Sequence, residues 1–430
     1  MMIMMFKKTM VSGLVAGAML AMSGTAAASG FASALQSGSG LGNAYAGGAA
    51  VAEDASTVFA NPAGMSQIKG SQVVVAGYAV KPTTKFSDTG SAPATASGQA
   101  LGGNGGDAGS WAFVPNLYYV MDVNPQMKFG LGISSPFGSN TNYEAGWAGR
   151  FQTLKSEIKT INVNPSLSYQ VNEMVTLGLG VNYQKINAEL TNNVVLGLGT
   201  VGAAKLSGSD SAPGYNLGAL FQVSPDTRLG LAYRSSINYQ LSGDVLVTNA
   251  TGSVVANPSV TADLKTPDSF SLSAFNKIDS KWDVMGDISW TGWSKFKELR
   301  VVNSSTGATT SLANYNWKDT YRVSLGANYH YSEQWMARAG VAFDQSPVSD
   351  ANRTARIPDN DRTWISVGGQ YKPSKESALD FGYAHQFIKD SAISNNNGSA
   401  GTPSTGTVGN LVGTYNNSVD ILSVQYAHSF

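Results

Sequence analysis

Apolar and polar side chains alternate over long stretches of the chain. Residues 174–184 read MVTLGLGVNYQ, so apolar residues fall on one face of a strand, and polar residues or glycines fall on the other. Residues 378–387 and 422–430 show the same alternation, and the chain ends on the aromatic Phe430. A period of two residues is typical of a β-strand with one apolar and one polar face. The pattern predicts an all-β protein.

Short turns and long loops alternate between the predicted strands. Short connections with turn-forming residues lie at 123–126, 171–173, 224–226, 277–280, 332–334 and 373–376. Longer stretches rich in Gly, Ser and Asn lie at 83–110, 136–150, 191–211, 248–256, 303–317, 345–360 and 389–415. Strands of about ten residues cross a bilayer when they are tilted. We therefore predict a transmembrane antiparallel β-barrel of about 14 strands at 71–430, with the long loops outside the cell.

Composition narrows the class of protein further. Only 13% of the residues are charged, against about 25% in typical soluble proteins. The mean hydropathy is −0.09, so the apolar residues are not gathered in long runs. The formal net charge is zero and no basic stripe is present, so no nucleic acid is predicted as a partner. The lack of cysteine excludes a disulfide framework and thiolate metal sites, and no cofactor is predicted.

The first 28 residues have the pattern of an export signal. Lys7 and Lys8 precede an apolar run at 11–22, and small residues at 26–28 provide a cleavage site before Ser29. We predict a signal peptide at 1–28. The alternative is a short membrane anchor, but the run is too short to span a bilayer comfortably. No later run of about 20 apolar residues exists, so no transmembrane helix is predicted in the mature chain.

Residues 29–70 do not follow the strand period. The segment is rich in Gly, Ala and Ser, which is also typical of a flexible linker. It contains more apolar side chains than a solvated linker would, namely Phe31, Leu35, Leu41, Tyr45, Val51, Val58, Phe59 and Met65. We therefore predict a compact N-terminal hatch, or plug, inside the lumen of the barrel.

Several motifs in this order resemble those of one family. The segment 40–65 reads GLGNAYAGGAAVAEDASTVFANPAGM and contains the triplet NPA at 61–63. It is followed by SPFG, WAGRFQ, INVNPSLSY, LAYRS, WKDTYRVSLG and IPDNDRTW, which together extend over nearly the whole mature chain. The chain thus resembles the FadL/TodX family of outer-membrane transporters for hydrophobic compounds.

The resemblance implies a monomeric, hatch-plugged barrel of fourteen strands in the bacterial outer membrane, surrounded by its lipid. It implies ligand-gated passive diffusion of hydrophobic small molecules, for which long-chain fatty acids are our first choice. A ligand would enter an outer apolar groove, move to a luminal site with basic groups, and leave sideways at a kinked third strand.

Candidate binding residues follow from these expectations. The outer groove is predicted at Val194, Val195, Leu196, Leu198 and Val201, and the alternative is ordinary loop packing. A carboxylate in a lumen of low dielectric constant needs a cation. The candidates are Arg150 and Lys318 first, then Arg322, Arg234 and Lys155. For each of them the alternative is an ion pair or a solvated wall residue, and Asp319 is an obvious competing partner of Lys318.

Two further motifs concern the gate. Asn61, Pro62, Ala63 and Gly64 form a predicted turn and a hatch contact against the kinked strand. Gly130 and Gly132 soften the third strand and predict the kink; alternatively, they only make room for the hatch. The motif IPDNDR at 357–362 is interpreted as a structural network of Asp359, Asp361 and Arg362 at the rim, and the alternative is a role in ligand binding.

The sequence also allows functions other than transport of fatty acids. The histidines His330, His385 and His428 belong to no recognisable nucleophile or metal motif, so no enzymatic activity is predicted. Uptake of aromatic or aliphatic hydrocarbons is the alternative within the family. A general diffusion porin or a surface receptor is the alternative from another class, and the hatch-like segment argues against the porin.

Overall fold

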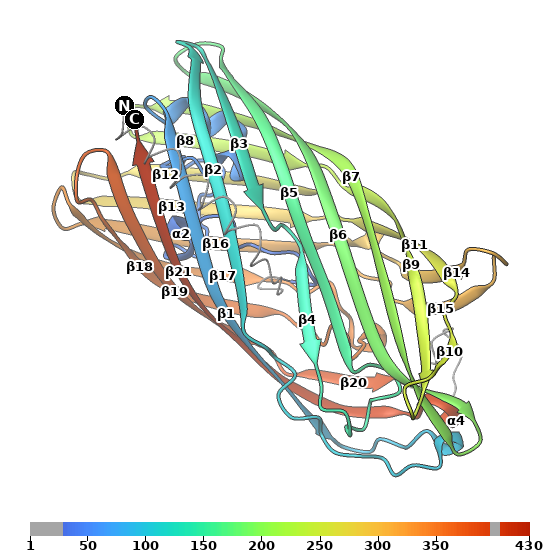
Figure 1. Ribbon diagram of the computed structural model, residues 1–430. Coiled ribbons are helices and arrows are strands. Elements are labelled where there is room, and N and C mark those ends of the chain that lie inside the picture. Colours follow the sequence, from blue (N-terminus) through green and yellow to red (C-terminus); the bar gives the residue numbers. More distant parts are fainter. Residues whose placement is uncertain (1–28, 396–404) are drawn as a thin grey trace, which may run out of the picture.

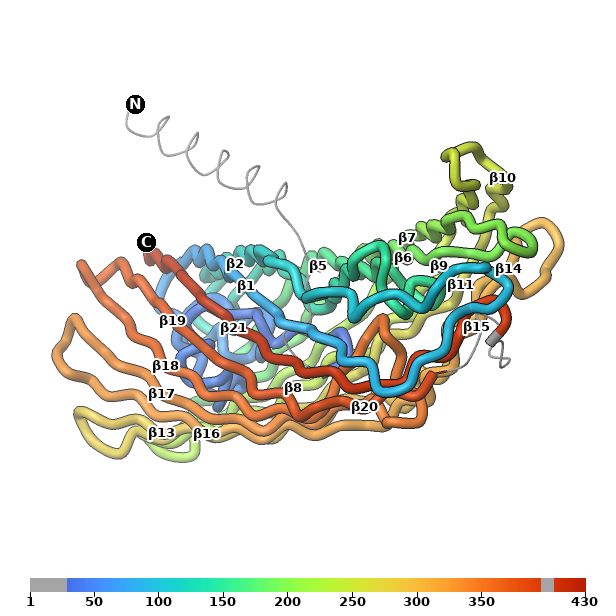
Figure 2. Tube along the Cα trace, turned by 90° about the horizontal axis from the view of Figure 1, so that it is seen from below, coloured from blue at the N-terminus to red at the C-terminus, as the bar shows by residue number. Residues whose placement is uncertain are grey.

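The computed structural model describes residues 29–395 and 405–430, and the predicted signal peptide lies outside them. The described residues form a long, closed barrel (Figure 1). Figure 2 shows the first described residues, in blue, enclosed by the strands in the half of the barrel where the C-terminus lies. The model contains no helix in the described residues that combines the length and the apolar character needed to cross a membrane.

One antiparallel sheet of 21 strands forms the wall of the barrel. Eight passes through the wall are single strands: β1 (Gln72–Asp88), β2 (Ala112–Asn124), β5 (Lys155–Gln170), β6 (Val175–Gly197), β7 (Thr200–Ser224), β17 (Trp335–Asp344), β18 (Arg362–Tyr371) and β21 (Leu411–Ser429). Six passes are interrupted and comprise β3 (Met127–Ser134) with β4 (Gly138–Asn142), β8 (Thr227–Arg234) with β9 (Ile237–Asn249), β11 (Ser259–Thr266) with β12 (Ser269–Lys277), β13 (Trp282–Thr291) with β14 (Glu298–Asn303), β15 (Thr309–Asn314) with β16 (Thr320–His330), and β19 (Ser377–Ile388) with β20 (Ser391–Asn395). The short β10 (Val254–Ala256) extends the hairpin that follows β9.

The barrel closes because its first and last strands pair. Each pass lies antiparallel to the next, and β21 pairs with β1 along the whole of Gln72–Asp88. The described residues therefore confirm the predicted barrel of about 14 strands.

Side chains alternate across this wall as the sequence predicted. In β6, Leu177, Leu179 and Val181 are about half exposed on the outer face, whereas Asn182 and Gln184 are buried on the inner face. An apolar outer band suits lipid hydrocarbon, and a polar inner face suits a lumen filled by protein or water. The strand sequences thus determine which candidate residues can reach the lumen.

The hatch fills part of the lumen with short turns rather than with a domain of regular structure. It contains α2 (Gly38–Leu41), α3 (Thr57–Ala60) and the 3-10 helix η1 (Pro62–Gln67). Leu35 and Leu41 are fully buried against wall residues. Small residues allow the backbone of the hatch to approach the backbone of the wall. A Cβ on Gly340 of β17, for example, would overlap the backbone of Asn43 in the hatch. The predicted position of the N-terminal segment inside the lumen is confirmed.

The outer loops carry the remaining helices. They are η2 (Thr95–Ser97), η3 (Trp293–Lys295), η4 (Asp350–Asn352) and α4 (Thr405–Val408). Beyond the barrel proper, β6, β7 and β9 continue as an extended sheet, at the end of which β10 projects (Figure 2).

Candidate functional site

The wall of the barrel contains a window between β2 and β4. β3 pairs with β2 on one side and β5 on the other, but among the described strands β4 pairs only with β5. Pairing of β2 with β3 begins at Leu117, so 112–116 has no strand partner on that side. Pro115 lies in this free edge. Proline has no N–H group to donate, and at a free edge no neighbouring strand requires one.

The strand breaks at 135–137, within the SPFG motif, and not at the glycines predicted to form the kink. Gly130 and Gly132 both lie in the regular ladder between β2 and β5. A Cβ on Gly130 would lie 2.6 Å from Val58 Cγ2 and even closer to the sulfur of Met65, both in the hatch. These glycines therefore make room for the hatch, which was the alternative interpretation.

The first described residues close the window from inside. Ser33 N donates to Pro136 O at 2.8 Å, and Gly138 N donates to Phe31 O at 2.9 Å. Ala32 and Phe137 form an isolated antiparallel bridge. On the other edge, Asn116 Nδ2 donates to Leu35 O at 2.8 Å. The segment 31–35 thus spans the window as a short substitute strand, which we call the closing segment.

An aromatic cage holds Phe31 of the closing segment. The Phe31 ring lies 4.7 Å from Trp293, 5.6 Å from both Phe296 and Trp317, and 5.9 Å from Phe137, between ring centroids. Its side chain is fully buried. The cage borders an apolar cavity of about 40 Å³, whose lining includes Ile158, Leu190, Leu206, Leu241, Val260 and Leu264. An apolar part of the lumen therefore extends to the closing segment on this side of the barrel.

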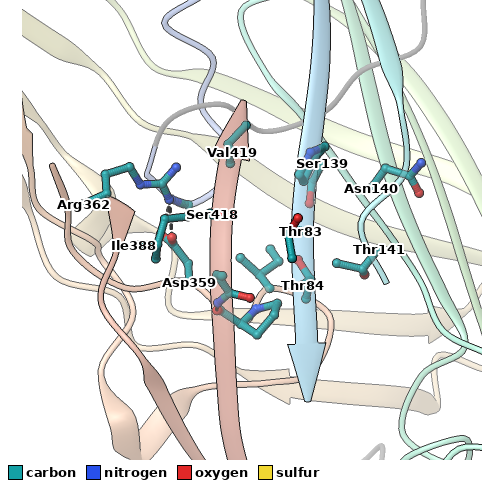
Figure 3. Close-up of a pocket in the computed structure, with 15 residues that line it drawn as sticks. Thr83, Thr84, Ser139, Asn140, Thr141, Asp359, Arg362, Ile388, Ser418 and Val419 are labelled. Atoms are coloured by element: carbon teal, nitrogen blue, oxygen red, sulfur yellow. Dashed lines mark hydrogen bonds and ion pairs between the residues drawn. The ribbon is translucent and has the colours of Figure 1, made fainter. Parts of the chain in front are cut away.

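A polar corner of the wall anchors the start of this segment (Figure 3). A cavity of about 70 Å³ lies here, between hydroxyl-bearing residues of β1 and β4. Asp359 pairs with Arg362 and accepts hydrogen bonds from Gly30 N at 2.8 Å and Ser346 Oγ at 2.7 Å. Asp361 accepts from Ser346 N at 2.8 Å. The IPDNDR motif thus forms a polar network, which also holds the backbone next to Phe31.

The five residues of the predicted outer groove do not share one face of the extended sheet. Val194 pairs with Gly202, and Leu196 covers Gly202, so both face the same side as Leu206 and the lumen. Val195 pairs with Val201, and the alternation places both on the opposite side. Leu198 lies at the tip and is 91% exposed. Val194 and Leu196 therefore lie on the face that leads into the apolar lumen.

Arg150 holds an outer loop and does not line the described luminal cavities. Its guanidinium donates to Leu101 O at 2.5 Å, Ala100 O at 2.6 Å and Trp147 O at 3.0 Å, and also to Gln99 Oε1. The side chain is 6% exposed. These acceptors occupy the donors that a ligand carboxylate would need.

Lys318 and Lys155 also lie away from the described luminal cavities. Lys318 is exposed at the outer rim, and its neighbour Asp319 accepts from Ser294 N at 2.7 Å instead of binding the lysine. Lys155 lies on the outer face of β5, where it pairs with Glu157 at 3.2 Å and Glu189 at 3.0 Å.

Arg234 and Arg322 are the two predicted cations that meet in the lumen. Both line a cavity of about 200 Å³ between the hatch and the wall strands β7, β8, β12, β13 and β16. Asp287 lines the same cavity, and its Oδ2 accepts from Ser273 Oγ at 2.6 Å. On the hatch side the cavity is bordered by Ala49, Phe59 and Pro62. We call it the hatch cavity.

The NPA turn fastens the hatch to β6 and β7. Asn61 is fully buried, and its Nδ2 donates to Ala49 O at 2.7 Å and Ala219 O at 3.0 Å, while its Oδ1 caps η1 by accepting from Ala63 N. Cβ atoms on Gly178 and Gly218 would overlap this turn. The turn therefore contacts these two strands, and Val58 and Met65 make the contact with β3.

An ionic network, buried except at Glu53, joins the hatch to the wall strands β17 and β19. Arg338 of β17 donates to both oxygens of Glu53, at 2.7 and 3.1 Å, and to Asp380 of β19 at 2.8 Å. Arg338 and Asp380 are 4% and 2% exposed. This network was not predicted from the sequence, although charged residues at inward positions of both strands were a signal for it. No described group of His, Cys, Asp or Glu side chains is arranged to hold a metal ion.

Taken with an apolar outer face, this architecture is that of a plugged transmembrane β-barrel with a break in its wall that the N-terminal segment covers. Residues 19–430 match the family described as outer membrane protein transport protein (OMPP1/FadL/TodX), and the chain belongs to that family. It is therefore a bacterial outer-membrane protein that transports hydrophobic compounds and has no enzymatic activity.

Individual relatives support this assignment. The chain is 29% identical over 391 residues to the long-chain fatty acid transport protein of Escherichia coli (strain K12), covering 81% of this chain and 85% of that protein. It is 32% identical over 409 residues to outer membrane protein P1 of Haemophilus influenzae, covering 86% and 89%.

Solved structures show the same fold. A Pseudomonas aeruginosa FadL homologue has a TM-score of 0.86 at 25% identity, covering 93% of this chain and all of that one. The Ralstonia pickettii toluene transporter TbuX has a TM-score of 0.65 at 20% identity, covering 92% and 99%, and shows likeness of fold alone.

Proposed function

We propose that the protein takes up long-chain fatty acids by gated passive diffusion, with exit through the side window into the membrane. The observation that carries this proposal is the window itself, where the closing segment, and no wall strand of the described residues, bridges the break at 135–138 to β2. A route that ends in the wall delivers an apolar chain to lipid without exposing it to water, which saves roughly 0.8 kcal/mol per methylene group.

The route begins at the extended sheet of β6, β7 and β9. Val194 and Leu196 provide an apolar face there, and an apolar cavity leads from Leu190 and Leu206 to the cage around Phe31. Movement of the closing segment would then connect the lumen with the window. The ladder of β2 and β3 need not break, because the window already lacks strand pairing.

The luminal arginines favour an acid over a hydrocarbon. An apolar lumen alone suits either ligand, but two inward guanidinium groups would remain desolvated beside a hydrocarbon. The E. coli relative is named for transport of long-chain fatty acids, which agrees with this preference.

Uptake by cells that lack their own fatty-acid transporter tests the proposal. Cells producing this protein should accumulate radiolabelled oleate, and excess palmitate should compete whereas toluene should not. Efficient competition by toluene would indicate a hydrocarbon channel. Diffusion of small sugars into proteoliposomes at porin-like rates would contradict the gated mechanism.

A further inference from the structure

Charged side chains form a patch on the outer face of β5, β6 and β7, toward the end of the barrel that carries the long loops. The alternation of the strands places these side chains outward, on the same face as Leu179, Val181 and Tyr183. The register of the three strands brings them into adjacent rows. We call this surface the lysine patch, and it comprises Lys155, Glu157, Lys159, Lys185, Glu189 and Lys205.

The lysines of the patch outnumber the acids that hold them. Lys155 pairs with both glutamates, with Glu157 at 3.2 Å and with Glu189 at 3.0 Å. Lys159 contacts Glu157 at 2.8 Å, and Lys205 contacts Glu189 at 2.7 Å. The fourth lysine is exposed. With four lysines for two glutamates, the patch carries a net charge of two positive charges.

The lysine patch begins where the apolar outer band ends. The outward side chains of β6 are apolar or aromatic from Leu177 to Tyr183, and the next outward residue toward the long loops is Lys185. Residues 175–183 extend about 26 Å along the strand, or roughly 20 Å in depth at a tilt of about 40°, which accounts for most of an apolar band of about 25 Å. The C-terminus lies at the opposite end of the barrel (Figure 1). Because the long loops of such barrels face the outside of the cell, the patch lies at the level of the head groups of the outer leaflet.

The patch lies between the window and β9. Lys159 of β5 pairs with Gly138 of β4, the strand at the edge of the window. On the other side, Asp244 of β9 pairs with Ser207 of β7 and brings a negative charge, which bounds the patch. A lipid held at the lysines of β5 would therefore extend its acyl chains along β5 into the bilayer, beside the break at 135–137.

We propose that the lysine patch binds the phosphate groups of a phosphorylated glycolipid of the outer leaflet and fixes this lipid beside the window. Clusters of lysines at a membrane surface attract anionic head groups. The apolar band directly below the patch favours a lipid over a soluble anion, because one amphiphilic molecule then covers both surfaces. The site lies on the outside of the barrel, so it does not depend on which compound is transported.

Binding of diphosphorylated lipid A to purified protein in detergent, without divalent cations, tests the site. The variant Lys159→Gln, Lys205→Gln should bind about 25-fold more weakly than the parent protein, since each lysine near a membrane surface contributes a factor of about five. Sodium chloride should weaken binding to the parent protein, because exposed charges are screened by salt. Lipid A without phosphates should bind weakly and to the same extent in both proteins.

Removal of the acids should have the opposite effect. The variant Glu157→Gln, Glu189→Gln keeps every lysine and raises the net charge of the patch from two to four, so it should bind lipid A at least fivefold more tightly. A merely structural role of these ion pairs predicts weaker binding in both variants. Weaker binding by the glutamine variant of the acids would therefore overturn the proposal.

Lys85→Gln, Lys265→Gln is the matched control. Both lysines lie on the outer face of other strands, β1 and β11, and the variant removes the same charge as the test variant. It should bind lipid A as the parent protein does. Retained heat-modifiable migration on gels establishes that each variant forms a folded barrel.

Three results would overturn the assignment of the patch. The first is an unchanged affinity in the variant Lys159→Gln, Lys205→Gln. The second is an equal loss in the control variant, which would indicate attraction by the overall charge of the barrel. The third is equal binding of lipid A with and without phosphates to the parent protein, which would indicate contact with the acyl chains alone.

Discussion

The cage around Phe31 makes a quantitative prediction about the closing segment. Phe31→Ala removes a fully buried ring that contacts four other aromatic rings. The strands of the barrel pair with one another independently of this ring, so the loss should fall on the docking of the closing segment. We expect the segment to detach more often while the barrel stays intact.

The size of the effect follows from the burial. Truncation of a buried Phe to Ala costs about 3–5 kcal/mol, which is a factor of roughly 10² to 4 × 10³ in an equilibrium constant. The backbone bonds to Pro136 and Gly138 and the bond between Gly30 and Asp359 remain in the variant. Partial collapse of the cage would bring the factor toward the lower end of this range.

Thiol labelling measures this opening directly. Ser33→Cys places the single thiol of the chain in the closing segment, and its reaction with maleimide reports the open fraction when opening and reclosing are fast. Labelling should be about a hundredfold faster in the Phe31→Ala background. Phe270→Ala is the control, because that ring lies on the outer face and is 42% exposed. Equal labelling rates with Phe31 present and absent would refute the role of the cage.

Three further substitutions test other contacts. Gly218→Ala should displace the NPA turn and destabilise the hatch by about 1–3 kcal/mol. Faster proteolysis of residues 29–70 would measure this loss. Gly208→Ala is the control, because Gly208 lies in the same strand with space for a Cβ, and this variant should behave like the parent protein. Arg338→Ala should lower the unfolding free energy in guanidinium by about 3–5 kcal/mol, since it leaves the buried carboxylate of Asp380 without a cation, whereas the exposed pair of Arg300 and Glu298 should contribute at most about 1 kcal/mol. Arg150→Ala should leave oleate affinity within about twofold but expose the loop at 89–111 to protease; a large loss of affinity would return Arg150 to the binding site.

The period of the sequence was sufficient to predict the barrel. Strict alternation in segments such as 174–184 requires one apolar and one polar face, and the alternating turns and loops limit the number of strands. The same alternation predicts that Arg234, Arg322 and Arg338 face inward, because each occupies the parity of the buried residues in its strand.

The alternation could not predict where a candidate side chain lies around the barrel or along its axis. Arg150 lies in a loop, and its acceptors in 99–101 belong to another loop whose path has no period. Glu53 meets Arg338 only because the hatch folds against β17, which a pattern within strands does not encode. The position of the break was predictable in principle, since Pro136 in SPFG interrupts a ladder more strongly than Gly130 or Gly132.

A reversible lock on the window tests the central claim most directly. Ala32 and Phe137 form an antiparallel bridge, and such pairs bring Cα atoms to about 4.5–5.5 Å, within reach of a disulfide. The variant Ala32→Cys, Phe137→Cys should take up oleate when reduced and lose uptake when oxidised, while oleate binding at the cell surface persists. Each single-cysteine variant should be indifferent to oxidation. Undiminished uptake by fully crosslinked protein would show that the fatty acid does not leave through this window.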